Sequence, residues 1–214
     1  MKNQSRPPLA QIQLTVDVAL FTIQEAKLKV LLTKRTNDPY KGFFALPGVF
    51  IWEEETSLDS SIRALKDKTG VSVPYVEQLH AFDGLERDPR SRIISVAHYA
   101  LVPDAMIDIY NLEAGSKLTD VDNIKDLAFD HSEIVEYALK TLREQIVISD
   151  IALRLLPEEF TLTDLQTIHE VVLGKKLDKR NFRRNILADG LLKETKNVRK
   201  GLQSRPAKLY KSNV

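Results

Sequence analysis

A loop near the middle of the chain places three arginines within six residues. The loop runs from Asp83 to Arg92, has the sequence DGLERDPRSR, and precedes an apolar stretch. Guanidinium groups donate paired hydrogen bonds to phosphate oxygens, and a nearby carboxylate can orient a guanidinium or accept from a ribose hydroxyl. Arg35, at the end of an earlier apolar stretch, can reach the same ligand cleft as the arginines of this loop. These residue types allow a phosphate-binding site, but they equally allow a solvated loop with a proline-fixed turn. The candidate ligand-binding residues are Arg35, Arg87, Asp88, Arg90 and Arg92.

A second group of cationic side chains lies near the C-terminus. From Phe160 to Val214 the chain holds 13 Lys and Arg residues against 5 Asp and Glu residues, a net charge of +8. The rest of the chain carries a net charge of −7, although the whole protein carries only +1. A segment this cationic is a candidate for binding a polyanion such as double-stranded DNA. Chance clustering on a solvated surface gives the same count. Whether the segment binds a polyanion therefore depends on its local fold.

The cationic segment has the pattern of a helix-turn-helix. Thr161 and Asp164 form the capping box of a first helix, and Asp178 can cap a second one. The apolar face of the second helix is expected to be Phe182, Ile186 and Leu187. A glycine-containing turn between two short helices is typical of this DNA-binding motif. Residues 191–195 and 207–211 can pair as a hairpin, with the loop 196–206 as a wing. The predicted DNA contacts are Lys179, Arg180, Asn181, Arg183 and Arg184 on the second helix, and Arg199, Lys200, Arg205 and Lys208 in the wing.

The N-terminal part of the chain mixes strand and helix patterns. Apolar residues at every second position from Ile12 to Leu20 predict a half-buried strand, and residues 28–32 repeat the pattern as the second arm of a hairpin. Ser57 is expected to cap a helix whose buried stripe is Leu58, Ile62 and Leu65 and which ends at Gly70. Further strands over 76–82 and 93–102 and a helix over 132–146 indicate a mixed α/β sandwich.

The helix that ends at Gly70 resembles a Nudix box, together with the Leu-Pro-Gly at residues 46–48. The family pattern is G-x5-E-x7-R-E-U-x-E-E-x-G-U, where U is aliphatic, and the chain matches it at Glu55, Arg63, Leu65, Gly70 and Val71. Val49 stands at the position of the box glycine. In active Nudix hydrolases the three later glutamates hold the divalent metal ions that activate water. Those positions are Ala64, Asp67 and Lys68 here, so the resemblance implies a degenerate box that has lost its hydrolase activity.

The whole arrangement resembles the Nudix-related transcriptional regulators of NAD metabolism. The arginine loop, residues 129–131 and the stretch 203–210 are similar to segments of these regulators, and the resemblance covers about residues 14–210. It implies a homodimeric repressor of NAD-metabolism genes, with ADP-ribose or a related nucleotide as the effector. One alternative is a Nudix pyrophosphohydrolase that acts on ADP-ribose or nucleoside diphosphates. Another is a sugar-responsive regulator on the same scaffold.

The composition sets the outer bounds of this interpretation. The chain has 214 residues and no cysteine, which excludes disulfides and thiolate metal sites. No apolar run approaches the ~20 residues that span a bilayer, so we expect a cytoplasmic protein without a membrane partner, a metal or a cofactor. The predicted fold is of the α/β class, a Nudix-type α/β/α sandwich followed by a winged helix-turn-helix domain. We expect a disordered lead over 1–9, a ligand-sensing domain over 10–148 and a DNA-binding domain over 149–214.

Overall fold

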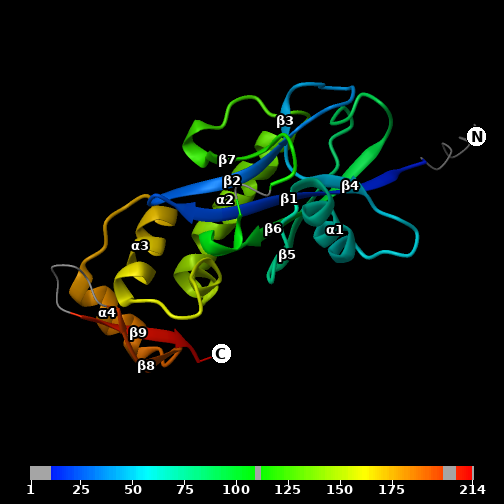
Figure 1. Cartoon of the computed structure of the whole chain (residues 1–214). Helices are drawn as coiled ribbons and strands as arrows, with labels where there is room; N and C mark the ends of the chain where they lie inside the picture. Colours follow the sequence, from blue (N-terminus) through cyan, green and yellow to red (C-terminus); the bar gives the residue numbers. More distant parts are fainter. Residues whose placement is uncertain (1–10, 109–111, 200–205, 214) are drawn as a thin grey trace, which may run out of the picture.

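The strand β1 (Gln13–Gln24) is the centre of a seven-stranded sheet in the computed structural model, which describes residues 11–108, 112–199 and 206–213. The expected disordered lead over 1–9 lies outside these ranges. The sheet has the order β3-β2-β1-β6-β5, with β4 paired to β1 and β7 paired to β2 (Figure 1). The other strands are β2 (Lys27–Lys34), β3 (Phe44–Ala45), β4 (Gly48–Phe50), β5 (Val76–Phe82), β6 (Ile93–Leu101) and β7 (Ser116–Asp120).

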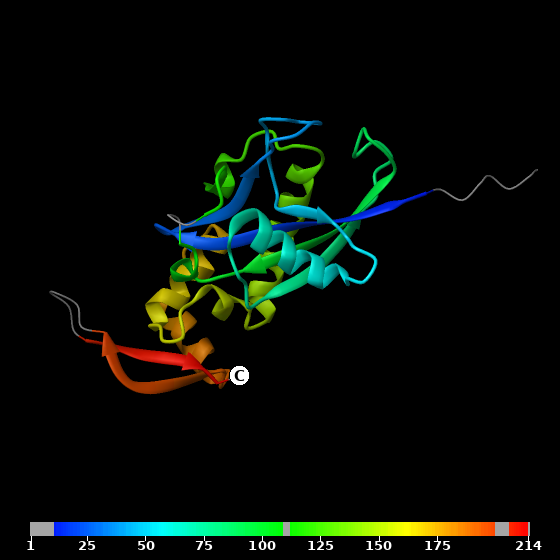
Figure 2. The same cartoon turned by 45° about the vertical axis from the view of Figure 1, so that its right-hand side comes forward.

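Both faces of β1 are buried, whereas the alternating sequence pattern predicts a strand with only one buried face. Val18 and Leu20 pack toward helix α1 (Ser57–Thr69), and Ala19 and Phe21 pack toward helix α2 (His131–Ile148). The alternation fails because β1 is the middle strand and the two helices cover opposite faces of the sheet, as Figure 2 shows. The predicted α/β/α sandwich is confirmed in this part of the molecule. The predicted hairpin is confirmed as well, since β1 and β2 pair in antiparallel fashion around a turn at Glu25 and Ala26.

Helix α1 packs against the sheet through small side chains. Its N-cap is Thr56, which forms a capping box with Asp59, so the predicted cap at Ser57 is wrong by one residue. The predicted buried stripe is confirmed at Leu65, which is fully buried, and wrong at Leu58 and Ile62, which are 45% and 43% exposed. The face toward the sheet is instead made of Ser60, Ser61, Ala64, Leu65 and Thr69. Small residues let the helix approach the strands closely, and the larger apolar residues are then left outside.

The C-terminal unit continues the core that α2 begins. Leu142 and Ile146 of α2 belong to the same apolar cluster as Leu155, Phe160 and Leu165. The unit consists of the 3-10 helix η3 (Ile151–Leu155), helices α3 (Leu162–Leu173) and α4 (Lys179–Ala188), and a hairpin of β8 (Leu192–Arg199) and β9 (Ala207–Ser212). Two shorter 3-10 helices, η1 (Asp104–Met106) and η2 (Val121–Asn123), lie in the N-terminal part. Because the core is continuous, the orientation of the helix-turn-helix depends on packing against α2.

The helix-turn-helix has the predicted start signals. Thr161 and Asp164 form the capping box of α3, and the side chain of Asp178 caps α4. Phe182 and Ile186 pack inward as expected, but Leu187 is 49% exposed and is not part of the buried face. Residues four apart share one face of a helix, whereas Leu187 is rotated away from that face by about 100°. Among the helices of the described residues, none combines the length and the apolar character needed to cross a bilayer.

Candidate functional site

A cleft of about 410 Å³ opens between β1, β4, α1 and the loop that joins β5 to β6. Asp17 lines it as a buried carboxylate, 6% exposed, and stands opposite Gly48 in the pairing of β1 with β4. The close pairing requires glycine, because a Cβ atom at Gly48 would lie 2.1 Å from Oδ1 of Asp17 and 2.8 Å from the carbonyl oxygen of Val16. Asp17 was not predicted as a site residue, although a carboxylate inside the apolar stretch 16–21 is a signal in the sequence for this site.

Arg87 lies beneath the cleft between two carboxylates. Its guanidinium donates to both carboxylate oxygens of Asp130 at 2.7 and 2.8 Å and to Oδ2 of Asp17 at 3.4 Å. Burial acts against the charge of Arg87, but the hydrogen bonds to Asp130 and the charge of Asp17 outweigh it and raise its pKa. Its side chain is only 4% exposed. Arg87 therefore holds the loop to β1 and to the start of α2 through its Nε and Nη2 atoms.

His131 completes the buried network. Its Nδ1 accepts a hydrogen bond from the backbone amide of Leu46 at 2.9 Å, and its Nε2 lies 3.4 Å from Oδ1 of Asp17. Burial lowers the pKa of His131, despite the nearby carboxylates of Asp17 and Asp130. The neutral imidazole fixes the Leu46-Pro47-Gly48 segment against the first turn of α2.

The rim of the cleft carries the more accessible arginines. The side chain of Arg90 is 42% exposed and forms a two-point ion pair with Asp88, whose own side chain is 3% exposed. Burial opposes the ionisation of Asp88, but the hydrogen bonds from Arg90 outweigh it and lower its pKa. Among the described residues, Arg35 donates to the backbone carbonyls of Pro39 and Asn37, and its Cζ stands 4.6 Å from the ring centre of Phe129. The cleft thus combines cationic side chains with an aromatic surface.

Arg92 does not line the cleft. Its guanidinium is exposed and donates to the carbonyl oxygens of Asp83 and Gly84 at 2.7 and 3.0 Å, which closes the base of its own loop. The structure therefore brings four of the five candidate ligand residues to one cleft, Arg35, Arg87, Asp88 and Arg90. Phe50, Trp52 and Phe129 also line it, although none of them was predicted as a site residue.

The Nudix-like segment keeps its scaffold, with Ala64 and Lys68 at two of the three later carboxylate positions. Arg63 binds Glu55 through two bonds of 2.7 Å and stacks 3.7 Å above the ring of Trp52. Hydrogen bonds from Arg63 hold the pKa of Glu55 at about 2, so this carboxylate is committed to the ion pair. Ala64 is fully buried, and Lys68 lines the cleft. Within residues 11–108, 112–199 and 206–213, no group of three or more His, Cys, Asp and Glu side chains is arranged to hold a metal ion.

The second candidate surface is the outer face of α4. Lys179, Arg180, Asn181 and Arg184 are exposed there, whereas Arg183 is half-buried and donates to Oγ1 of Thr163 on α3 at 3.3 Å. Phe182 anchors the opposite face of α4 by packing edge-to-face on His169 of α3, with ring centres 5.0 Å apart. The helix therefore presents one cationic face to the solvent.

The hairpin beside α4 adds cations that already have partners. Arg199 pairs with Asp164 at 2.8 Å, and Lys208 pairs with Glu194 at 2.8 Å. Exposed ion pairs of this kind are worth at most about 1 kcal/mol, so DNA phosphates can displace the carboxylates. The other two predicted wing contacts, Lys200 and Arg205, lie outside the described residues.

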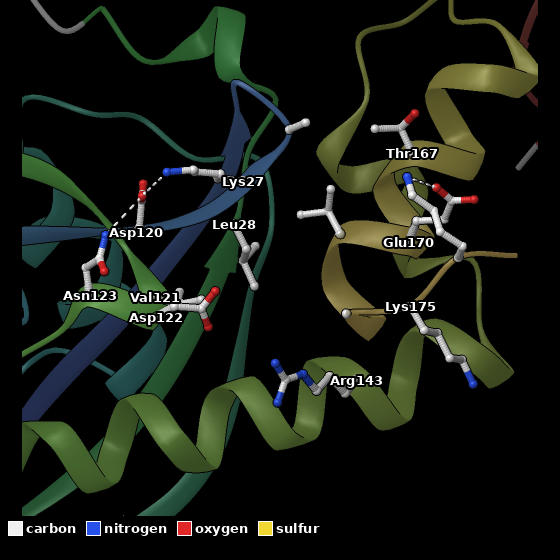
Figure 3. Close-up of a pocket in the computed structure, with 14 residues that line it drawn as sticks. Lys27, Leu28, Asp120, Val121, Asp122, Asn123, Arg143, Thr167, Glu170 and Lys175 are labelled. Atoms are coloured by element: carbon white, nitrogen blue, oxygen red, sulfur yellow. Dashed lines mark hydrogen bonds and ion pairs between the residues drawn. The ribbon is translucent and has the colours of Figure 1, made fainter.

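A cavity of about 540 Å³ lies between the edge of the sheet and helix α3, beside the shared core (Figure 3). Lys27 and Asp120 form an ion pair of 2.7 Å on the sheet side, and Glu170 of α3 is held by Lys176 at 2.7 Å on the other. Arg143 of α2 borders the cavity and donates to the carbonyl oxygen of Val172. The sheet and the helix-turn-helix are thus linked by α2 and the shared core, with open space beside them.

Comparison with known proteins gives matches over nearly the whole chain. The family model of the NrtR DNA-binding winged helix domain matches residues 152–212. The protein is 35% identical over 203 residues to the ADPR responsive transcriptional repressor NtrR of Acinetobacter baylyi, which covers 92% of this chain and 81% of that protein. Over 119 residues it is 34% identical to the ADP-ribose pyrophosphatase of Methanocaldococcus jannaschii, covering 56% of this chain and 70% of that protein.

Solved structures agree with these matches. The crystal structure of Shewanella oneidensis NrtR complexed with a 27mer DNA aligns with a TM-score of 0.86 at 36% identity, covering 94% of this chain and 93% of that one. The NUDIX domain of the same NrtR, in complex with ADP ribose, aligns with a TM-score of 0.57 at 35% identity and covers 65% of this chain and 94% of that one. The likeness therefore extends over both halves of the molecule.

Proposed function

Because the chain belongs to the NrtR family, in which a Nudix domain is joined to a DNA-binding winged helix, we propose that it is a transcriptional repressor that responds to ADP-ribose. The N-terminal sandwich binds the effector, and the C-terminal unit binds an operator in double-stranded DNA. We further propose that its targets are genes of NAD metabolism.

The observation that carries this proposal is the cationic outer face of α4. A recognition helix in the major groove needs donors that reach base edges, and it needs its other face to be anchored in the protein. Helix α4 meets both requirements, since Arg180 and Arg184 are exposed while Phe182 packs on α3. The hairpin β8–β9 lies next to it as the wing and offers Arg199 and Lys208 to the phosphate backbone.

The cleft supports a phosphorylated effector. Its cationic side chains suit the diphosphate of ADP-ribose, and its aromatic residues Phe50, Trp52 and Phe129 suit a base or a ribose. This balance favours a nucleotide over an unphosphorylated sugar. Isothermal titration of the protein with ADP-ribose and with ribose tests which of the two is the effector. Tighter binding of ribose would favour the sugar-responsive regulator instead.

A homodimer fits the binding of an operator with two half-sites. Two-fold symmetry would place two α4 helices in successive major grooves, about one helical turn or a multiple of a turn apart. Exposed apolar side chains on β1, β4 and α1 offer surface for a second copy, among them Leu14, Phe50 and Ile62. Light scattering after size-exclusion chromatography measures the mass, and a monomer at micromolar concentration would contradict this part of the proposal.

We propose that the Nudix domain does not hydrolyse its ligand. Ala64 and Lys68 remove two of the three carboxylates of the box, and Glu55 is bound to Arg63. The similarity to an ADP-ribose pyrophosphatase supports hydrolysis as the second candidate function. Chromatography of ADP-ribose incubated with protein and Mg²⁺ separates the two. Turnover in the ordinary enzyme range, on the order of 1–10³ per second, would establish the enzyme.

The decisive experiment for the repressor is a fluorescence anisotropy titration against DNA upstream of the protein's own gene and of neighbouring genes. We expect one fragment to bind at least tenfold more tightly than random duplex, and we expect ADP-ribose to change that affinity. The affinity should also fall steeply with salt, because each phosphate neutralised adds about −0.9 to the slope of log K against log salt. Equal binding to all fragments, with and without ADP-ribose, would refute the repressor function.

A further inference from the structure

We propose that the ammonium group of Lys68 takes the place of a divalent metal ion in holding the diphosphate of the effector, so that ADP-ribose binds without any metal. This inference rests on the proposed function and deepens it. It starts from a mismatch, because the Nudix fold implies a metal site and the residues of this chain do not fit one.

The mismatch lies on one face of α1. Ala64, Asp67 and Lys68 share that face, since residues three and four positions apart are neighbours on a helix. Ala64 is fully buried and offers no oxygen, so only Asp67 remains as a carboxylate of this set. Magnesium prefers an octahedral shell of oxygen ligands, and an ammonium group beside it would repel it. The same ammonium attracts the phosphate oxygens that a metal ion would otherwise neutralise.

Lys68 occupies a suitable place in the cavity. It lines the ligand cleft, and it also lines the adjoining cavity of about 280 Å³ between α1 and the end of β2. Arg35, Asn37, Leu46 and Gly48 border both spaces as well, so Lys68 stands where the two spaces meet. A diphosphate bound there would lie within reach of α1 on one side and of Arg35 on the other.

The remaining cations of the cleft are already neutralised. Arg63 is paired with Glu55, Arg87 with Asp130 and Asp17, and Arg90 with Asp88; these pairs involve only described residues. Arg35 donates only to backbone carbonyls, and the ammonium of Lys68 has no ion pair within residues 11–108, 112–199 and 206–213. Lys68 and Arg35 are therefore the cations of the cleft that form no ion pair among the described residues, although the carboxylate of Asp38 also lines the cleft and attracts Arg35. Each phosphate of the diphosphate carries a negative charge, which these two cations can receive.

A purely structural role for Lys68 predicts something different. Cations in the last turn of a helix interact favourably with its C-terminal partial charge, and α1 has two of them, Lys66 and Lys68. Both are exposed, but Lys66 lines neither the cleft nor the adjoining cavity. Lys66→Glu is therefore a matched control for Lys68→Glu, with the same change of charge on the same turn of the helix.

The test is isothermal titration of the full-length protein with ADP-ribose, once in EDTA and once in Mg²⁺. We expect the wild type to bind equally well in both. We expect Lys68→Glu to weaken binding roughly ten- to hundredfold relative to Lys66→Glu, the range for losing a charge-assisted hydrogen bond. Lys68→Arg should keep most of the affinity. Thermal unfolding of each variant, expected to match the wild type, shows that the fold is retained.

The outcomes separate this inference from the proposed function. If the wild type binds ADP-ribose only with Mg²⁺, or if Lys68→Glu binds as well as Lys66→Glu, the role of Lys68 is refuted and the repressor function stands. If the wild type does not bind ADP-ribose under either condition, the proposed effector fails and this inference fails with it.

Discussion

Replacing Arg87 by methionine should damage the fold before it damages ligand binding. The guanidinium of Arg87 is buried between Asp130 and Asp17, with hydrogen bonds of 2.7, 2.8 and 3.4 Å. Methionine keeps much of the side-chain volume but removes every donor. The variant would leave one partly buried and one buried carboxylate without their cation, since the side chains of Asp130 and Asp17 are 13% and 8% exposed.

The size of the loss follows from that burial. Removing one partner of a buried ion pair costs about 3–5 kcal/mol, because the remaining charge stays desolvated without compensation. Asp17 keeps the hydrogen bond from the hydroxyl of Ser95 at 2.6 Å, and this places the expected loss at the lower end, near 3 kcal/mol. A domain of ordinary stability has only about 5–15 kcal/mol in total. The variant should therefore fold but unfold at a clearly lower urea concentration.

Urea unfolding followed by circular dichroism measures this effect. The double variant Arg87→Met/Asp130→Asn removes one of the stranded charges and should recover about 1–3 kcal/mol, the usual coupling energy of residues in direct contact. Arg35→Met is the control, because Arg35 borders the same cleft and donates only to backbone carbonyls. An Arg87→Met variant as stable as the wild type but unable to bind ADP-ribose would show that Arg87 is a ligand residue and that this reasoning is wrong.

Three further results are expected. Gly48→Ala should lower the free energy of unfolding by about 1–3 kcal/mol in urea titrations, because its Cβ atom would overlap Asp17 and the carbonyl oxygen of Val16; an unchanged midpoint would show that the strands yield freely. Arg184→Ala should cost about 1–3 kcal/mol of operator affinity and relax the preference at one base pair, whereas Lys175→Ala, on the exposed turn before α4, should leave the base preference unchanged. Burial lowers the pKa of His131, so the folded state binds fewer protons than the unfolded state. The stability that comes from burying a neutral His131 is therefore present above about pH 6.5. It is lost as the pH falls through the folded pKa, by up to about 1.4 kcal/mol per pH unit. In urea titrations from pH 8 to 5, the free energy of unfolding should fall less steeply for His131→Asn than for the wild type.

Local signals in the sequence were sufficient to predict most of the helix-turn-helix. A capping box needs only two residues three positions apart, so Thr161 and Asp164 could be identified without knowing the fold. The face of α1 could not be predicted in the same way. Helix periodicity selects the largest apolar residues, but the sheet selected the small ones, Ser60 and Ala64, because they permit a close approach. Which face of an amphipathic helix is buried depends on its partner as well as on its own pattern.

The charge network of the cleft was beyond local reasoning for a different reason. Arg87 is 70 residues from Asp17 and 43 residues from Asp130 in the sequence. An arginine in a cationic loop has the same local pattern whether it faces a phosphate or a buried carboxylate, and only the tertiary fold separates the two roles. The sequence therefore predicted a cationic cleft, but it could not show that Arg87 also holds two carboxylates or that Arg92 closes the base of its own loop.

A repressor that senses ADP-ribose has a physical reason to lose the metal site of a Nudix box and keep the rest. An active hydrolase would destroy the ligand, and occupancy would then depend on the rate of turnover. When the ligand stays intact, occupancy depends only on its concentration and its dissociation constant, and the coupling to DNA is an equilibrium quantity with equal effects in both directions. Ala64 and Lys68 stand at two of the three carboxylate positions of the box, while the ion pair between Glu55 and Arg63 still fixes the loop before α1 to the helix. These two substitutions fall on carboxylate positions of the box, whereas the pair of Glu55 and Arg63 that shapes this segment is kept.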